Sequence, residues 1–294
     1  MQLVQTVSDL ATTLPRGASM RAFVPTMGAL HAGHSALVRR AREVAGSDGH
    51  VVVSIFVNPT QFEPNEDFAR YPRQLDQDLS ICADAGADVV FAPSVDEMYP
   101  AGKARVADGF AMPPLPEVAT RPKLEDASRP THFIGVVKVV ARLFDIVQPS
   151  LAIFGEKDYQ QLRVISEMVL QQRPRWNDLQ IIPHPTIRER DGLAMSSRNA
   201  YLTTGQRKTA LTLWRALSEA KQERTPAAAE DVMRVLLEEA GFEIDYAAVR
   251  DAQTLMPVVR FDRPCRALIA ARIGGAEGVG GTRLIDNMAV EHSR

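Results

Sequence analysis

The chain has 294 residues, of which 45% are hydrophobic and 24% are charged, and its formal net charge at pH 7 is −2. This composition is typical of a globular protein and lacks the basic excess of nucleic-acid binders, so we expect no nucleic-acid partner. No apolar run reaches the roughly 20 residues that cross a bilayer, and the N-terminus lacks a signal-peptide pattern, so we expect a cytoplasmic protein without membrane contact.

The first half of the chain alternates short apolar runs with helical patterns. Strand candidates are Arg21–Val24, Val51–Val57, Asp88–Phe91 and Leu151–Phe154, and helix candidates are Ser35–Val44, Leu75–Ala85, Phe133–Val147 and Tyr159–Leu170. Strands separated by helices favour a parallel sheet with right-handed crossovers. We therefore predict an α/β protein whose N-terminal domain, residues 1–185, has a Rossmann-like parallel sheet.

Between Pro100 and Pro130 the periodic pattern lapses, and several prolines occur. A loop of this length in a compact domain is usually a lid, a binding loop or a disordered segment, and we expect a flap that covers substrate.

The pattern changes after about Pro185. Helix candidates are Thr204–Arg224 and Pro226–Ala240, and strand candidates are Ile244–Val249, Ala267–Ala271 and Arg283–Ile285. Helices followed by neighbouring strands favour a small α+β domain, residues 186–294. The two cysteines, Cys82 and Cys265, lack metal-ligand spacing and are expected to be idle thiols.

The stretch VPTMGALHAGH, Val24–His34, is the first that suggests chemistry. A strand, a glycine-containing turn and a His-x-Gly-His at a helix start would direct backbone N–H groups at a phosphate. His31 and His34 could add donors, most strongly when protonated, and Gly33 leaves room for a nucleobase or ribose. The alternative is a helix cap with two surface histidines.

The stretch GEKDYQQL, Gly155–Leu162, follows a predicted buried strand and begins a helix. Ligand sites of parallel sheets lie at such strand ends. Lys157 is a candidate phosphate clamp, and Asp158 could accept from a ribose hydroxyl. An ordinary capped helix start is the alternative.

Two further stretches carry polar side chains. In DGLAMSSRNAYL, Ser196 and Ser197 precede Arg198, and small donors beside a cation suit an oxygen that gains charge in a transition state. In SIFVNPTQF, Gln61 offers donors and an acceptor for a carboxylate and a hydroxyl. A solvated loop and a polar turn are the alternatives.

The order of these stretches is the layout of nucleotidyl-transfer enzymes with a HIGH-type signature and a KMSKS-like loop. Together, PTMGALHAGH, SIFVNPTQF, ARYPR, SRPTHFIGV, FGEKDYQQL, DGLAMSSRNAYL and RLIDN resemble the pantothenate synthetase (pantoate–β-alanine ligase) family from about Pro25 to Asn287. The resemblance implies that ATP and pantoate give pantoyl adenylate and pyrophosphate, and that β-alanine then displaces AMP. It also implies a homodimer, and Mg²⁺ is expected with ATP.

The resemblance assigns residues to roles. The implied catalytic residues are His31, His34, Lys157, Ser196, Ser197 and Arg198. The implied ATP site comprises Met27, Gly28, Ala29, Leu30, His31, Ala32, Gly33, His34, Gly155, Glu156, Lys157, Asp158, Ile187, Met195, Ser196, Ser197 and Arg198. The implied pantoate site comprises Gln61, Gln161, Asn58, Tyr71, Arg129 and His132, with Gln61 also near β-alanine. Asp78 is a candidate magnesium ligand, with a solvated helix carboxylate as the alternative.

Two positions depart from the family pattern. Lys138 stands in GVVKVV, where a small hydroxyl residue is usual, and could add charge near pantoate or extend to solvent. Pro183-His184 replaces a more typical Gly-Val. The alternative functions are another HIGH-type nucleotidyltransferase and a nucleotide-binding sensor that has lost the chemistry.

Overall fold

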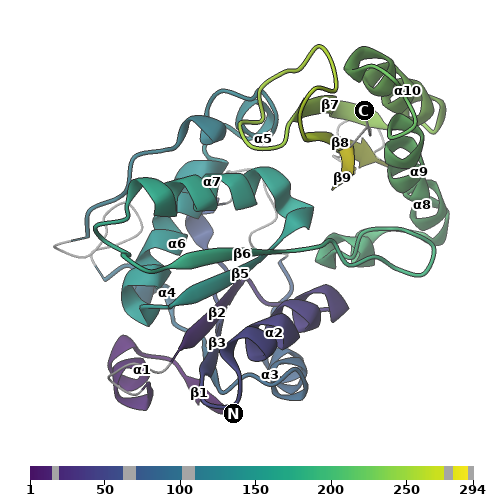
Figure 1. Ribbon diagram of the computed structural model, residues 1–294. Helices are drawn as coiled ribbons and strands as arrows, with labels where there is room; N and C mark the ends of the chain where they lie inside the picture. The colour runs from purple at the N-terminus through teal and green to yellow at the C-terminus, as the bar shows by residue number, and fades with distance from the viewer. Residues whose placement is uncertain (15–19, 62–70, 101–109, 275–280, 291–294) are drawn as a thin grey trace.

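The computed structural model describes residues 1–14, 20–61, 71–100, 110–274 and 281–290. The N-terminal part is a six-stranded sheet in the order β1-β4-β3-β2-β5-β6, and every neighbouring pair is parallel (Figure 1). Its strands are β1 (Gln2–Val4), β2 (Arg21–Thr26), β3 (His50–Ile55), β4 (Val89–Phe91), β5 (Leu151–Gly155) and β6 (Gln180–His184). The predicted parallel α/β fold is confirmed.

Helices cover both faces of this sheet. They are α1 (Val7–Thr13), α2 (Ala32–Ala45), α3 (Leu75–Asp84), α4 (Val95–Met98), α5 (Glu125–Ser128), α6 (His132–Val147) and α7 (Tyr159–Gln171). Successive strand side chains point to opposite faces, so Phe23 joins the apolar cluster beneath α6 and α7 while Val24 joins the cluster beneath α2. The central strands are apolar on both faces because both faces are covered.

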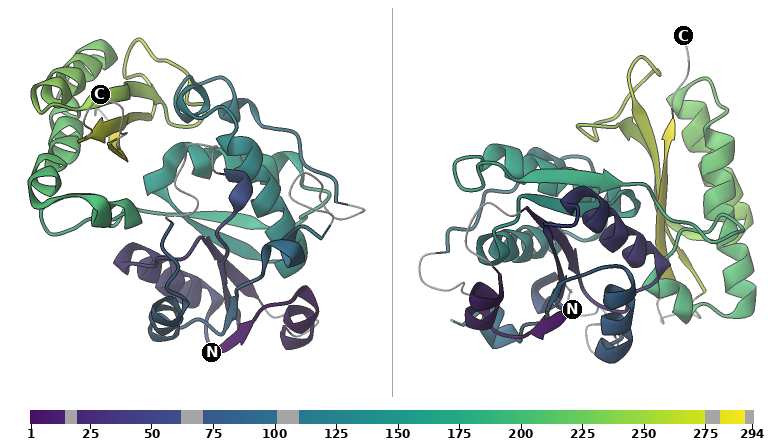
Figure 2. Two further views of the ribbon diagram at one scale, coloured as in Figure 1. Left: turned by 180° about the vertical axis from the view of Figure 1, so that it is seen from behind. Right: turned by 60° about the horizontal axis from the view of Figure 1, so that its bottom comes forward.

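The C-terminal part is a three-stranded antiparallel sheet backed by helices (Figure 2). It contains β7 (Glu243–Asp251), β8 (Cys265–Ile273), β9 (Thr282–Val290), α8 (Thr204–Thr209), α9 (Leu211–Ala220) and α10 (Pro226–Glu239). Leu213, Leu217, Met233 and Leu237 are buried against Ile269 of the sheet. The small α+β domain is confirmed, although the helix predicted over Thr204–Arg224 is two helices that meet at Ala210.

Two strands of the N-terminal sheet escape prediction. β1 has three residues, and β6 contains Pro183, which argues against a strand when the sequence is read alone. Both lie at edges of the sheet, where a proline without an N–H is tolerated.

The described part of the proline-rich segment is packed on the N-terminal domain. Its short helical turns are η2 (Glu117–Ala119) and α5. Gln160 donates to the Val118 carbonyl (2.8 Å) and accepts from the Glu125 N–H (2.9 Å). The predicted flap is therefore anchored to α7 at Val118 and Glu125, and its residues Glu125, Ser128 and Arg129 line a cavity. Residues 101–109 lie outside the described chain.

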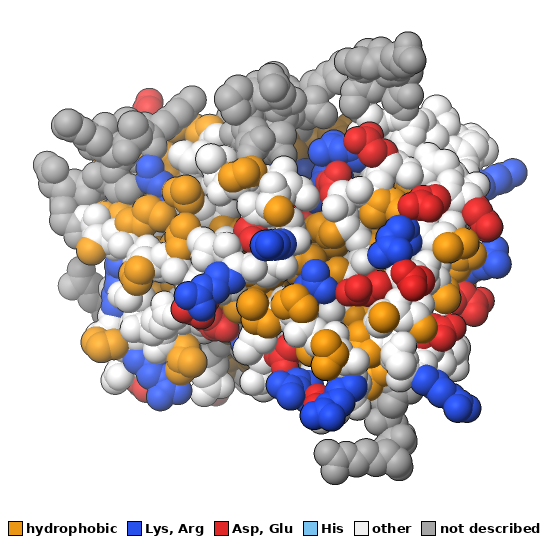
Figure 3. Space-filling view, turned by 90° about the horizontal axis from the view of Figure 1, so that it is seen from above, with side chains coloured by type: hydrophobic (Ala, Val, Ile, Leu, Met, Phe, Trp, Pro, Cys, Tyr) orange, Lys and Arg blue, Asp and Glu red, His pale blue; other side chains and the backbone are white. Residues whose placement is uncertain are grey.

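Surface charges do not segregate by sign on the face drawn in Figure 3. Lys and Arg side chains are interspersed there with Asp and Glu. This mixture agrees with the near-neutral charge of the whole chain. In the described residues, no helix combines the length and apolar character needed to span a membrane.

Candidate active site

The candidate site lies where the strand order of the parallel sheet reverses. From β2 the chain moves outward through β3 and β4, and it then returns to place β5 on the other side of β2. Parallel sheets bind ligands outside the carboxyl ends of strands at such a switch point. The His31–His34 turn follows β2 and the Gly155–Asp158 segment follows β5, so the topology brings these two predicted motifs together.

The two histidines cap helix α2 reciprocally. His31 Nδ1 accepts from the Gly33 N–H (3.1 Å), and His34 Nδ1 accepts from the His31 N–H (3.3 Å). A methyl group added at Gly33 would lie 2.8 Å from His31 Cε1, so only glycine leaves room for the folded-over ring. The alternative of a helix cap is thus correct in part, and the same cap orients both rings.

The cap also fixes the protonation of the histidines. Because Nδ1 of each ring accepts a hydrogen bond, each neutral ring carries its proton on Nε2. Burial, aided by the charge of Lys157, lowers the pKa of His31 to about 4. Burial and neighbouring His31 lower the pKa of His34 to about 3. At neutral pH both rings are therefore neutral donors, and the expectation that they act best as cations is not supported.

Asp78 holds the turn that precedes the histidines. Gly28 and Ala29 have φ values of +83° and +52°, and the N–H groups of Ala29 and Leu30 bind Asp78 Oδ2 (3.0 Å) and Oδ1 (2.8 Å). Asp78 is 1% exposed, and burial raises the pKa of its carboxyl. Both oxygens thus hold backbone, which gives Asp78 a structural role and does not support a magnesium contact or a solvated carboxylate.

Lys157 supplies the positive charge beside the histidines. It lies in the short turn η3 (Glu156–Asp158) between β5 and α7. Its Nζ is 3.7 Å from Asp158 Oδ1, and about half of the Asp158 side chain is exposed. Lys157 depresses the pKa of both histidines, which places its charge next to their rings.

The Ser-Ser-Arg segment is carried by a tight hairpin of residues 187–195. The Met195 N–H donates to the Ile187 carbonyl (3.0 Å), and Leu193 is buried in the C-terminal core. Ser196 then caps the turn η4 (Ser197–Tyr201) by accepting from the Arg198 N–H (3.3 Å). The predicted loop is therefore an anchored turn.

A buried network orients Gln61 at the end of β3. Asn58 is fully buried, and its Oδ1 accepts from the Thr60 N–H while its Nδ2 donates to the Gly135 carbonyl. The same Nδ2 donates to Gln61 Oε1 (3.0 Å), so the Gln61 NH₂ group is left to face the site. Asn58 does not line the cavity that Gln61 borders, so it acts behind Gln61.

A cavity of about 240 Å³ connects these segments. The predicted residues that line it are Met27, His31, Gly33, His34, Gln61, Tyr71, Arg129, His132, Gly155, Lys157, Asp158, Gln161, Ile187, Met195, Ser196, Ser197 and Arg198. The predicted residues that do not line it are Gly28, Ala29, Leu30, Ala32, Asn58, Asp78 and Glu156. Most of the residues that do not line the cavity belong to the turns that carry the lining residues, or support those turns.

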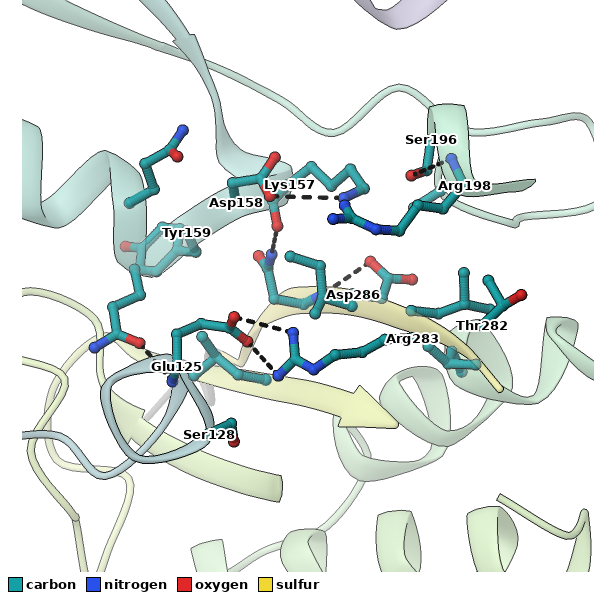
Figure 4. Close-up of a pocket in the computed structure, with 18 of the residues that line it drawn as sticks. Glu125, Ser128, Lys157, Asp158, Tyr159, Ser196, Arg198, Thr282, Arg283 and Asp286 are labelled. Carbon is teal, nitrogen blue, oxygen red and sulfur yellow. Dashed lines mark hydrogen bonds and ion pairs between the residues drawn. The ribbon is translucent and has the colours of Figure 1, made fainter. Parts of the chain in front are cut away.

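A larger chamber of about 760 Å³ adjoins this cavity between the two sheets. Lys157, Ser196 and Arg198 lie at one end of it and Glu125 with Arg283 at the other (Figure 4). Burial alone would raise the pKa of Glu125, but the charge and hydrogen bonds of Arg283 hold it below its ordinary value. Their ion pair (2.7 Å) ties α5 to β9 at that end of the chamber.

Sequence reasoning missed one wall of the smaller cavity. Val136, Val139, Val140 and Leu143 of α6 line it. Residues 133–141 of α6 are apolar apart from Lys138, and a segment that is apolar on more than one face has a second surface beyond the one packed on the core. That apolar run was the available signal.

The two departures from the family pattern lie in different places. Lys138 is 8% exposed, its Nζ lies 5.2 Å from the Tyr99 ring, and it lines neither cavity, so it adds no charge to the pocket. His184 does line the smaller cavity, and its Nδ1 lies 2.9 Å from the Pro185 carbonyl.

Comparison with known proteins places this site in a family. The family model for pantoate-beta-alanine ligase matches residues 2–289. The chain belongs to the pantoate–β-alanine ligase family. Pantothenate synthetase from Rubrobacter xylanophilus is 50% identical over 91% of this chain and 90% of its own length.

Solved structures of this ligase family share the fold. Pantothenate synthetase from Thermus thermophilus has a TM-score of 0.86 and 43% identity over 99% of this chain and 100% of that chain. The Francisella tularensis ligase, in complex with beta-gamma ATP and β-alanine, has a TM-score of 0.77 and 33% identity over 100% and 99% of the respective chains. These likenesses make the protein an ATP-using acid–amine ligase and remove the alternative of a different HIGH-type nucleotidyltransferase.

Proposed function

We propose that this ligase condenses pantoate with β-alanine through a pantoyl adenylate, with release of pyrophosphate and AMP. The observation that carries the proposal is that His31, His34 and Lys157 line one cavity at the switch point of the sheet. The Francisella tularensis relative, whose structure is complexed with beta-gamma ATP and β-alanine, supports the choice of substrates.

In the first step a carboxylate oxygen of pantoate attacks the α-phosphorus of ATP. The new P–O bond forms as the bond to the bridging oxygen breaks, and pyrophosphate leaves with that electron pair. The Nε2–H groups of His31 and His34 donate to phosphoryl oxygens, and Lys157 neutralises charge that develops on them. Preformed donors of this kind stabilise the transition state more than the ground state.

Arg198 and the hydroxyls of Ser196 and Ser197 complete the donor set from the C-terminal side. These residues border the same cavity as Lys157, so the phosphates would lie between the two groups. The Tyr71 hydroxyl hydrogen-bonds Ser197, and burial raises the pKa of Tyr71, so it remains a neutral donor or acceptor.

Pantoate combines a carboxylate and two hydroxyls with two methyl groups, and the cavity offers both kinds of surface. We assign the polar end to the Gln61 NH₂ group together with Gln161, Arg129 and His132. The apolar wall of Val136 and Val139 suits the methyl groups. The amine of β-alanine then attacks the acyl carbon, and the acyl–oxygen bond breaks as AMP leaves.

We also propose that residues 186–294 form a lid on the domain of residues 1–185. β6 ends at His184, and the chain then enters the hairpin that carries Ser196–Arg198. Closure would exclude water from the adenylate. Amide hydrogen exchange across residues 191–202 should slow when ATP is added, and equal exchange in both states would count against a lid.

Three further expectations belong to the proposal. Mg²⁺ would accompany the ATP phosphates, and Asp158 is the pocket carboxylate suited to it by oxygen chemistry and exposure. No cluster of three or more His, Cys, Asp or Glu side chains that could hold a metal occurs among the described residues. We expect a cytoplasmic homodimer, and light scattering in solution would measure its mass.

The test of the proposed function is pyrophosphate release from Mg·ATP. Pantoate alone should release pyrophosphate in one burst, and β-alanine added afterwards should release AMP and pantothenate. Acids without the two methyl groups serve as controls. Binding of ATP without release in the presence of pantoate would instead support the nucleotide-binding sensor.

A further inference from the structure

Asn287, a residue of the C-terminal domain, holds the backbone of the Lys157 turn. It lies on β9 and is 3% exposed. Its Nδ2 donates to the carbonyls of Glu156 (2.9 Å) and Lys157 (2.8 Å). These bonds cross from one domain to the other, and the residues they join are about 130 positions apart in the chain.

Arg266 fixes the orientation of the Asn287 amide. Its Nε donates to Asn287 Oδ1 (2.7 Å), and its second terminal nitrogen donates to Glu156 Oε2 (2.9 Å). The Arg266 residue is 8% exposed, and its guanidinium carbon lies 4.0 Å from the centre of the Tyr159 ring. Because Oδ1 accepts from a cation, Nδ2 must face the two carbonyls.

The preceding residue of β9 holds the other phosphate-binding segment. Asp286 is 2% exposed and accepts two hydrogen bonds from Arg188 (2.7 and 2.9 Å). Arg188 also donates to the Gly192 carbonyl (3.0 Å) and pairs with Ala194 in the hairpin that ends in Ser196. The position of that hairpin therefore depends on Asp286.

We propose that Asp286 and Asn287 are positioning residues that set Lys157 and the Ser196–Arg198 turn at the spacing which adenylation requires. One strand fixes both segments, since neighbouring residues of β9 hold each of them. Figure 4 shows Asp286 on β9, below Lys157 and Arg198, and it lines the chamber. This inference rests on the proposed function, because it assumes that both segments bind the same phosphates.

A double-mutant cycle tests the proposal with the full-length protein. Asn287→Ala should slow the first turnover of pyrophosphate release about 100-fold, since displacement of a catalytic group by about 1 Å can have that effect. The KM for pantoate should change far less than kcat. In a Lys157→Met background the same substitution should slow the reaction less than about threefold, because coupled residues are not additive.

Two other variants separate positioning from general loosening of the domains. Arg163→Ala removes a contact between α7 and the Gln253 carbonyl (3.0 Å) that lies away from the site, and it should leave the rate unchanged. Arg266→Lys keeps a charge near Glu156 but releases the Asn287 amide. It should lower kcat about tenfold, which is less than the loss expected for Asn287→Ala. Arg266→Lys also tests the positioning role of Asn287 if the Asn287→Ala protein does not fold.

The outcomes are distinguishable. Equal losses from Asn287→Ala in both backgrounds, or an Arg163→Ala enzyme as slow as Asn287→Ala, would overturn the positioning role and leave the proposed function intact. A Lys157→Met enzyme of near-normal rate would reject the role of Lys157, and the inference with it. The proposed function itself would fail only if pantoate released no pyrophosphate from Mg·ATP with the unaltered enzyme.

Discussion

Two of the segments proposed to bind phosphate are built in opposite ways. The His31–His34 turn is held by its own neighbours, through two reciprocal caps and the carboxylate of Asp78 from the adjoining α3. The Lys157 turn receives its polar support from Asn287, in the other domain. A domain movement would therefore leave the first segment intact and release the second, so the cation is the component of the site that the domain arrangement controls.

The largest expected effect comes from removing that cation. Lys157→Met should slow adenylation about 100- to 1,000-fold, as loss of a transition-state donor does. Folding should be little changed, because Asn287 binds the backbone carbonyls of this turn and not the Lys157 side chain. Lys221→Met, an exposed charge removal at the end of α9, is the control. Rapid-quench measurement of pyrophosphate within threefold of normal would contradict the assignment.

A matched pair of substitutions at His34 separates its two functions. Asn can place an acceptor where Nδ1 accepts from the backbone, whereas Gln can reach the position of Nε2. His34→Asn should keep the cap but slow adenylation about 100-fold. His34→Gln should retain more activity and lose about 1 kcal/mol of stability, the usual effect of a lost cap. The reverse pattern in rates and urea unfolding would show that the ring acts only as a cap.

Asp78 offers a test of local support that does not involve the domains. Asp78→Ala would leave two buried N–H groups without an acceptor, and at about 1–3 kcal/mol for each we expect about 3 kcal/mol of lost stability. Asp84→Ala, an exposed change in the same helix, should be nearly neutral. Similar unfolding free energies for the two variants would refute the role of Asp78.

The two buried histidines also make stability depend on pH. The unfolded chain protonates these histidines near pH 6.5, whereas the folded chain does so only near 4 and 3. The unfolded state thus binds more protons as the pH falls below about 6.5, and stability should decrease toward acid pH. The His31→Asn, His34→Asn double variant should lose less stability between about pH 7.5 and pH 5. Parallel urea-unfolding curves for both proteins would contradict the lowered pKa values.

The sequence predicts the part of the site that neighbouring residues build better than the part that depends on residues far apart in the chain. His31, Gly33 and His34 lie within four positions, and their spacing alone predicts a turn at a helix start. Lys157 was also predicted, but the RLIDN segment carried no local signal for Asn287, because its partners lie in another domain. Hydrogen bonds between distant segments leave no periodic pattern in a sequence.

The fold shows the same division. Long apolar runs such as the one in β3 predict central strands, and these predictions were confirmed. The edge strand β6 and the break at Ala210 depend on which neighbours are present, so they could not be predicted from local pattern. The anchoring of the predicted flap could not be predicted either, because buried Gln160 binds backbone groups of residues that are distant in the sequence.

The central claim is that pantoate is activated at its carboxylate by AMP. Pantoate labelled with oxygen-18 in the carboxylate tests this directly when the enzyme completes one turnover with Mg·ATP and β-alanine. Mass spectrometry should find one heavy oxygen in AMP, transferred when the acyl–oxygen bond breaks, and one in the amide carbonyl of pantothenate. Unlabelled AMP, with the heavy oxygen in inorganic phosphate or pyrophosphate, would contradict the adenylate mechanism.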